Sequence, residues 1–189
     1  MTRKAVLISI RPEWCARIAS GKKTIEVRKT SPKLETPFKC YIYCTKDPGN
    51  KGSATHFFES DEGTFWSAGK TFAAFLSGTV IGEFVCDSIQ TLFFDSDVRY
   101  GIDHPNDYGK KIMERSCLTL WEIQDYLEGK DGYTYHISNL QIYDRPKVLS
   151  DFKTYNTRVV IENGFPMPTH EIKRPPQSWC YVEKQTGAV

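Results

Sequence analysis

The sequence predicts an α+β protein, built as a small mixed β-barrel of about five to seven strands with two or three short helices around it. Short β-branched runs such as Ala5–Ile10 indicate buried strands, because they are too short and too branched for helices. Gly82 within the run 79–86, and Gly78 just before it, indicate strongly bent strands, which suit a small barrel. Capping signals at 11–12 and 119–122 indicate two short helices.

The N-terminal elements follow from local patterns. Pro12 suits a first helical position, and Gly21 is a natural C-terminal cap, so the residues between them predict a helix of about two turns. Polar and apolar residues alternate over Thr24–Lys29, which predicts a strand with Glu26 and Arg28 on one face. The aromatic and apolar run Phe38–Thr45 predicts a central strand.

The middle of the chain is less regular. Residues 47–71 lack a period and predict a long loop, whereas 72–76 and 79–86 predict strands, with a bulge or close backbone approach at Gly82. The polar segment 95–111 is turn-prone. The chain shows no repeat and no clean domain boundary.

The last third begins with a capping box over Thr119–Glu122, which predicts a helix that runs to about Glu128 and stops at Gly129. A strand over 133–143 is expected to end at Pro146, and 178–183 predicts a last strand. We therefore expect a barrel domain over 1–145 and a C-terminal extension over 146–189 that packs on the same domain.

Composition narrows the class of protein. The 189 residues are 40% hydrophobic and 25% charged, and no apolar run approaches the roughly 18 residues that a membrane span needs. No signal peptide is visible, so a cytoplasmic location with free thiols is expected for the six scattered cysteines. Neither Cys-x-x-Cys nor a close histidine pair occurs, so we expect no metal site and no cofactor.

Charge is unevenly distributed. Residues 1–33 contain nine Lys or Arg against two Glu, a net charge of +7, and the remaining residues carry a net charge of −5. A basic face of this kind attracts phosphate, although solvated charges on a helix and a turn explain it equally well.

The segment Gly21–Arg28 fits the pattern Gly-x-Lys-x-x-Glu-x-Arg through Lys23, Glu26 and Arg28. Together with the preceding Ser9-Ile10-Arg11-Pro12 and the short helix, it resembles the start of ASCH domains, which are PUA-like β-barrels. The resemblance covers residues 5–90 and extends to the strand and helix at 119–143. It implies a crevice beside the barrel, lined by the motif, that binds RNA or a modified nucleoside or nucleotide.

Physical reasoning about the motif leaves two interpretations. Gly21 lets the chain turn sharply, so Lys23 projects from the turn while Glu26 and Arg28 stand about 7 Å apart on one strand face. Glu26 then either orients the cations toward a ligand or forms an ordinary strand ion pair.

Other residues supplement this candidate site. Arg11 at the helix start is a candidate phosphate contact, with solvent exposure as the equal alternative, and Trp66 in the long loop is a candidate ligand contact. The remaining aromatic candidates are better explained by core packing than by base stacking: Trp14, Tyr41, Tyr43 and Trp179.

Three functions remain open. The first is a module that binds RNA or a modified nucleotide. The second is a hydrolase, since the resemblance implies that some members are amidohydrolases on acylated pyrimidine nucleosides; Lys23 and Glu26 would then be catalytic. Glu26, however, stands where those enzymes have a threonine, and their distal acid matches Glu114 or Glu122 only loosely. A nuclease is a variant of this second function, but the sequence shows no metal-binding cluster of acidic residues to support it. The third is a non-enzymatic protein-interaction module, for which the sequence identifies no partner.

Overall fold

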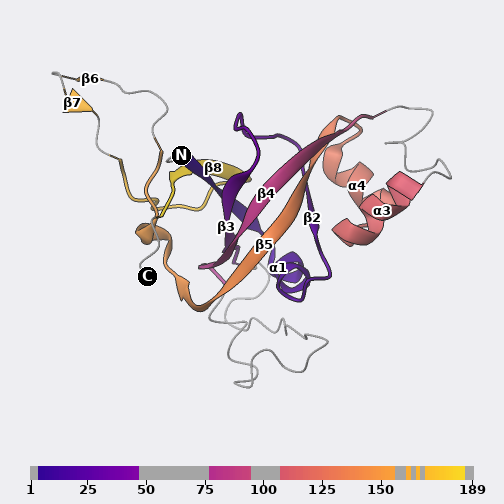
Figure 1. Cartoon of the computed structure of the whole chain (residues 1–189), viewed down its shortest axis with the longest axis horizontal. Coiled ribbons are helices and arrows are strands. Elements are labelled where there is room, and N and C mark those ends of the chain that lie inside the picture. Colours follow the sequence, from indigo (N-terminus) through magenta and orange to yellow (C-terminus); the bar gives the residue numbers. More distant parts are fainter. Residues whose placement is uncertain are drawn as a thin grey trace.

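The computed structural model describes residues 4–46, 77–94, 107–155, 161–162, 165–166 and 169–185, and it confirms the predicted α+β class (Figure 1). The described strands are β1 (Lys4–Ile10), β2 (Ile25–Arg28), β3 (Phe38–Cys44), β4 (Val80–Leu92), β5 (Gly132–Lys147), β6 (Ile161–Glu162), β7 (Phe165–Pro166) and β8 (Trp179–Glu183). The described helices are α1 (Pro12–Ala19), α3 (Asp107–Ser116) and α4 (Leu120–Leu127), followed after β5 by a 3-10 turn at Leu149–Asp151.

Six of these strands form one mixed sheet in the order β2-β5-β4-β3-β1-β8, and β6 and β7 form a separate pair. β1 and β3 are parallel, and the other neighbours in the sheet are antiparallel. A parallel pair requires a crossover connection, which here contains α1 and β2. The edge strands β2 and β8 do not pair with each other within the described residues, so the sheet is open rather than the closed barrel that the sequence predicted.

Side chains bridge the seam between the two edges of the open sheet. Trp179 Nε1 donates to Thr30 Oγ1 at 3.0 Å, and the backbone N–H of Lys33 donates to the hydroxyl of Tyr181 at 2.7 Å. These bonds hold the segment after β2 against β8 without a backbone ladder. The sheet is therefore curved like a barrel but remains open where only side chains span the gap.

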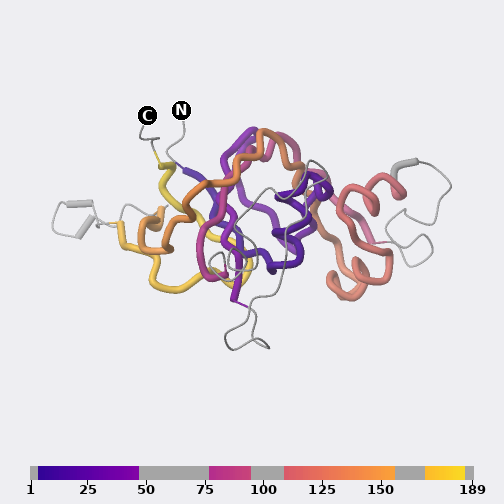
Figure 2. The backbone as a smooth tube through the Cα atoms, turned by 90° about the horizontal axis from the view of Figure 1, so that it is seen from below, coloured from indigo at the N-terminus to yellow at the C-terminus, as the bar shows by residue number. Residues whose placement is uncertain are grey.

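Both faces of β1 are buried, which explains its uninterrupted apolar sequence. Val6, Ile8 and Ile10 join the cluster inside the curved sheet, whereas Ala5 and Leu7 join a second cluster on the other face. C-terminal residues cover that second face: Phe152, Ile172 and Val182. Figure 2 shows the C-terminal segments and the pair α3–α4 on opposite sides of the sheet.

The two helices after β4 cover the outer face of β2. Ile112 of α3 and Ile123 and Leu127 of α4 pack with Val27 of β2. No helix within the described residues is long and apolar enough to span a membrane.

The capping signals around α4 are confirmed. Thr119 Oγ1 accepts from the backbone N–H of Glu122 at 3.3 Å, and the N–H of Thr119 donates to Glu122 Oε2 at 2.7 Å. The chain leaves the helix through Glu128 and Gly129, both with positive φ.

Gly82 is confirmed as a site of close backbone approach beside a bulge. The β4–β5 register shifts between Val80 and Gly82, and a Cβ on Gly82 would lie 2.5 Å from the carbonyl oxygen of Gln141. This contact explains why a glycine interrupts the strand.

Two strand ends differ from the prediction. β4 continues to Leu92. β5 continues past Pro146, which lies between Ile142 and Lys147, where the register with β4 is irregular. The missing N–H of the proline therefore breaks no regular ladder. The turn-prone interpretation of 95–111 was wrong at its end, where α3 begins at Asp107. The predicted loop 47–71 and strand 72–76 lie outside the described residues.

A polar network on the sheet centres on Glu83. Lys39 Nζ donates to Glu83 Oε1, and the hydroxyl of Tyr143 donates to Glu83 Oε2 at 2.6 Å. Burial raises the pKa of Glu83, but these two hydrogen bonds outweigh it, so the pKa lies below the ordinary value. The carboxylate is therefore ionised and paired in the folded protein.

Candidate functional site

The turn after α1 places the motif. The N–H of Gly21, whose φ is 74°, donates to the carbonyl of Ile18 at 2.9 Å, and the N–H of Lys23 donates to the carbonyl of Arg17 at 2.8 Å. Glycine adopts this left-handed conformation without penalty, so the helix ends sharply and the chain turns into β2.

Lys23 is almost completely buried at the end of this turn. Its Nζ donates to the carbonyl oxygen of Ser116 at 2.6 Å, lies 3.3 Å from Glu26 Oε2, and sits 5.2 Å from the ring centroid of Trp14. The guanidinium of Arg17 lies 5.2 Å from the same ring. Lys23 is therefore held by a carbonyl oxygen, a carboxylate and the face of an aromatic ring.

Glu26 connects Lys23 to Arg28. Arg28 Nη2 lies 3.0 Å from Glu26 Oε1 and donates to the carbonyl oxygen of Ser9 at 2.6 Å, across the seam. Lys23, Glu26 and Arg28 are only 2%, 7% and 6% exposed. The structure therefore brings these three predicted side chains together.

One polar atom of this cluster has no partner. Arg28 Nε is buried and makes no hydrogen bond in the structure. A buried unsatisfied donor costs about 1–3 kcal/mol, and a buried ion pair adds little net stability over apolar packing. The cluster therefore lowers the stability of the fold relative to apolar packing, which is typical of a functional site.

A cleft of about 820 Å³ opens at the seam beside this cluster. Its walls come from the end of β1, the start of α1, β2, the segment after β3, α4 and the segment before β8. Four basic and four acidic residues line the cleft. The basic residues are Arg11, Lys23, Arg28 and Lys46, and the acidic residues are Glu13, Glu26, Glu122 and Asp125. The cleft therefore carries balanced charge, although its N-terminal walls come from the basic segment 1–33.

The structure places the remaining predicted residues unequally. Arg11 is exposed at the N-cap of α1, and both it and Pro12 line the cleft. Trp66 lies outside the described residues. Glu114 does not line the cleft, whereas Glu122 does.

The four aromatic candidates differ in burial. Tyr41 and Tyr43 are core residues, as expected from packing. Trp14 is half-buried in the cleft wall and stacks against the cations of Arg17 and Lys23, so it supports Lys23. Trp179 is half-buried and packs edge-on against Tyr181.

Sequence reasoning missed Asp125 and Tyr126, which line the cleft from α4. Only the fold brings this helix opposite β2, and no local signal marks either residue. Glu122 was identified only as a cap and as a loose match to a distal acid. The capping hydrogen bonds from Thr119 lower the pKa of Glu122, with Arg17 and Lys23 contributing, so its carboxylate is ionised.

The six cysteines are free. Burial raises the pKa of Cys15 and Cys40 well above the ordinary thiol value, and it raises that of Cys86 to about 12 and that of Cys180 to about 11. Among the described residues, no three His, Cys, Asp or Glu side chains are grouped so as to hold a metal ion.

No protein-family model and no curated protein matches the chain. Solved structures do match. The ASCH protein from Zymomonas mobilis aligns with a TM-score of 0.57 and 21% identity, over 97% of this chain and 90% of that one. Two single-substitution mutants of that protein give TM-scores of 0.56 at 21% and 20% identity, over 96% of this chain and 92% and 90% of theirs.

Proposed function

From the ASCH fold that this chain shares with those structures, we propose that it binds single-stranded RNA or a modified nucleotide in the seam cleft. The observation that carries the proposal is the buried group Lys23–Glu26–Arg28, which lines an open cleft and leaves Arg28 Nε without a partner. A ligand acceptor at Arg28 would supply the missing hydrogen bond. RNA is read in sequence-specific complexes mainly through unpaired bases whose edges reach such donors.

The position of the cations suggests how a nucleotide lies in the cleft. Arg11 is exposed at the start of α1, where the helix dipole favours an anion. Lys46 also lines the cleft. We place the phosphate near these two residues and the base deeper, against Glu26 and Arg28.

The contacts of Lys23 favour binding over hydrolysis. A general base needs a free lone pair, yet Lys23 Nζ donates to Ser116 and pairs with Glu26. The same contacts fix a positive charge in the wall of the cleft, which suits recognition of a ligand acceptor.

Salt-dependent binding of a short single-stranded RNA tests the proposal. Each phosphate contact contributes about −0.7 to the slope of log K against log salt for single strands. We expect the double variant Arg11→Ala, Lys46→Ala to bind at least about fivefold more weakly than wild type and to lose about 1.4 units of slope, which is two contacts at about 0.7 each.

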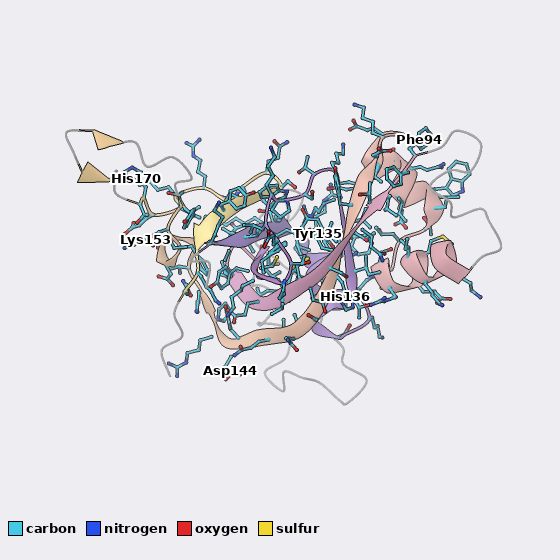
Figure 3. The ribbon with its side chains drawn as sticks, turned by 45° about the horizontal axis from the view of Figure 1, so that its top comes forward. Phe94, Tyr135, His136, Asp144, Lys153 and His170 are labelled. Atoms are coloured by element: carbon cyan, nitrogen blue, oxygen red, sulfur yellow. The ribbon has the colours of Figure 1, made fainter. Side chains whose placement is uncertain are left out.

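The matched control is Lys153→Ala, because Lys153 is exposed and lies on the opposite side of the sheet from α4 (Figure 3). It should bind as wild type does. Equal affinity and equal slope for all three proteins would refute a nucleotide site in this cleft.

A further inference from the structure

The α4 wall of the cleft is acidic and is held in place by the core. Ile123 and Leu127 are buried against β2 and α3, which turns Glu122, Asp125 and Tyr126 toward the cleft at helical spacing. The packing of this helix, rather than any motif, therefore sets which side chains face the ligand.

This wall presents hydrogen-bond acceptors. Glu122 uses Oε2 to accept from Thr119, which leaves Oε1 available, and its lowered pKa keeps it ionised. The carboxylate of Asp125 makes no hydrogen bond within the described residues. A carboxylate only accepts hydrogen bonds, so this wall calls for a donor on the ligand.

The opposite wall presents a donor. Arg28 Nη2 is committed to Ser9 and Glu26, whereas Nε is buried without a partner. Arg28 lines the cleft, so this N–H is the unpaired donor of that wall. The ligand must therefore offer an acceptor on this side and a donor on the side of α4.

We propose that this donor–acceptor pair makes the cleft selective for bases that carry an exocyclic amino group, a selectivity that rests on the proposed nucleotide binding. In cytosine and adenine an amino donor lies beside a ring-nitrogen acceptor, so the amino group bonds Asp125 and the acceptor bonds Arg28. Uracil places a carbonyl oxygen where the amino group would be, directly against the carboxylate of Asp125. The hydrogen bond from the amino group is then lost, and the carbonyl oxygen and the carboxylate of Asp125 repel each other.

Calorimetric titration with cytidine, adenosine and uridine 5′-monophosphates tests this selectivity, because the three ligands share one phosphate and its contacts cancel. We expect cytidine or adenosine monophosphate to bind wild type at least about tenfold more tightly than uridine monophosphate, the scale of one good base contact. In Asp125→Asn the side-chain amide also donates, so the preference should fall to about twofold or reverse toward uridine.

The matched control is Asp144→Asn. Asp144 is an exposed acid at the end of β5 far from α4 (Figure 3), and it does not line the cleft. Because Asp125 and Asp144 are both exposed, both variants should keep the unfolding midpoint of wild type, and the control should keep the wild-type preference.

The outcomes separate the two proposals. Equal binding of the three monophosphates to wild type, or an unchanged preference in Asp125→Asn, overturns the selectivity while nucleotide binding stands. If neither the monophosphates nor single-stranded RNA bind wild type, both proposals are refuted.

Discussion

Glu26→Gln removes the one anion that holds two buried cations together. Glu26 Oε2 lies 3.3 Å from Lys23 Nζ, and Oε1 lies 3.0 Å from Arg28 Nη2. The substitution preserves the size of the side chain and one acceptor oxygen, but it replaces the second acceptor by an amide donor. Lys23 and Arg28 then lose the carboxylate that both of them contact.

The expected cost follows from the burial of all three groups. Removing one partner of a buried pair costs about 3–5 kcal/mol, and the remaining acceptor of Gln places this variant near the lower end, at about 3 kcal/mol. For a chain of this size each kcal/mol shifts the melting temperature by about 2–4 °C, so we expect a fall of about 6–12 °C.

Thermal unfolding followed by far-ultraviolet circular dichroism measures this shift, with urea titration as a second measurement. Glu128→Gln is the matched control, because Glu128 pairs with Lys29 at 2.5 Å on the exposed surface. Water screens that pair, so its loss should leave the midpoint unchanged. A Glu26→Gln midpoint within about 1 °C of wild type would show that Glu26 does not neutralise the cations, and the reasoning about the site would fail.

Four further predictions concern pH, thiol chemistry, packing and catalysis. Because the pKa of Glu83 is lowered in the folded protein, its stabilisation is present above the ordinary pKa of 4.5 and is lost as pH falls through the lower folded value. The melting temperature of wild type should therefore fall more steeply between pH 5 and about 3 than that of Glu83→Gln, and parallel slopes would contradict this pairing. At pH 8 a thiol reagent should label half-buried Cys117 before Cys180, as followed by mass spectrometry. The pKa of Cys180 is about 11, so only about one Cys180 thiol in a thousand is a thiolate at this pH, and faster labelling of Cys180 would contradict the prediction. Gly82→Ala should lower the stability by about 1–3 kcal/mol in urea titration, since its Cβ meets backbone at 2.5 Å, and an unchanged midpoint would contradict that contact. Incubation with N4-acetylcytidine should release no cytidine on chromatography, because Lys23 is held as a donor, and release that Lys23→Met abolishes would restore the hydrolase hypothesis.

Local chemistry was sufficient to predict the elements whose signals lie within a few residues. The capping box at Thr119 and Glu122 marked the start of α4, and the alternation over β2 placed Glu26 and Arg28 on one face. Gly21 marked the end of α1 for the same reason, because only a glycine takes that backbone conformation freely.

Features that depend on distant neighbours were not predicted. α3 carries few apolar residues, and its helix is stabilised by burial of Ile112 against Val27, a contact that the sequence does not display. Pro146 was expected to end β5 because its partner strand, and the irregular register there, were unknown. Asp125 lines the cleft only because the packing of α4 on the core turns it that way, which the sequence does not show.

The open seam links these observations, since it creates both the edge of the sheet and the site. Ile137 N–H donates to the carbonyl of Thr24, so alternation of the ladder turns the backbone groups of Ile25 and Val27 away from β5 and toward the seam. In a closed barrel another strand would pair with these groups, whereas here side-chain hydrogen bonds span the seam, such as that from Arg28 to the carbonyl of Ser9. A side-chain bridge occupies less of the edge than a strand does, and it leaves room for a ligand beside buried charges. In the proposed function, the failure of the sheet to close is what gives a ligand access to the cleft that Lys23, Glu26 and Arg28 line.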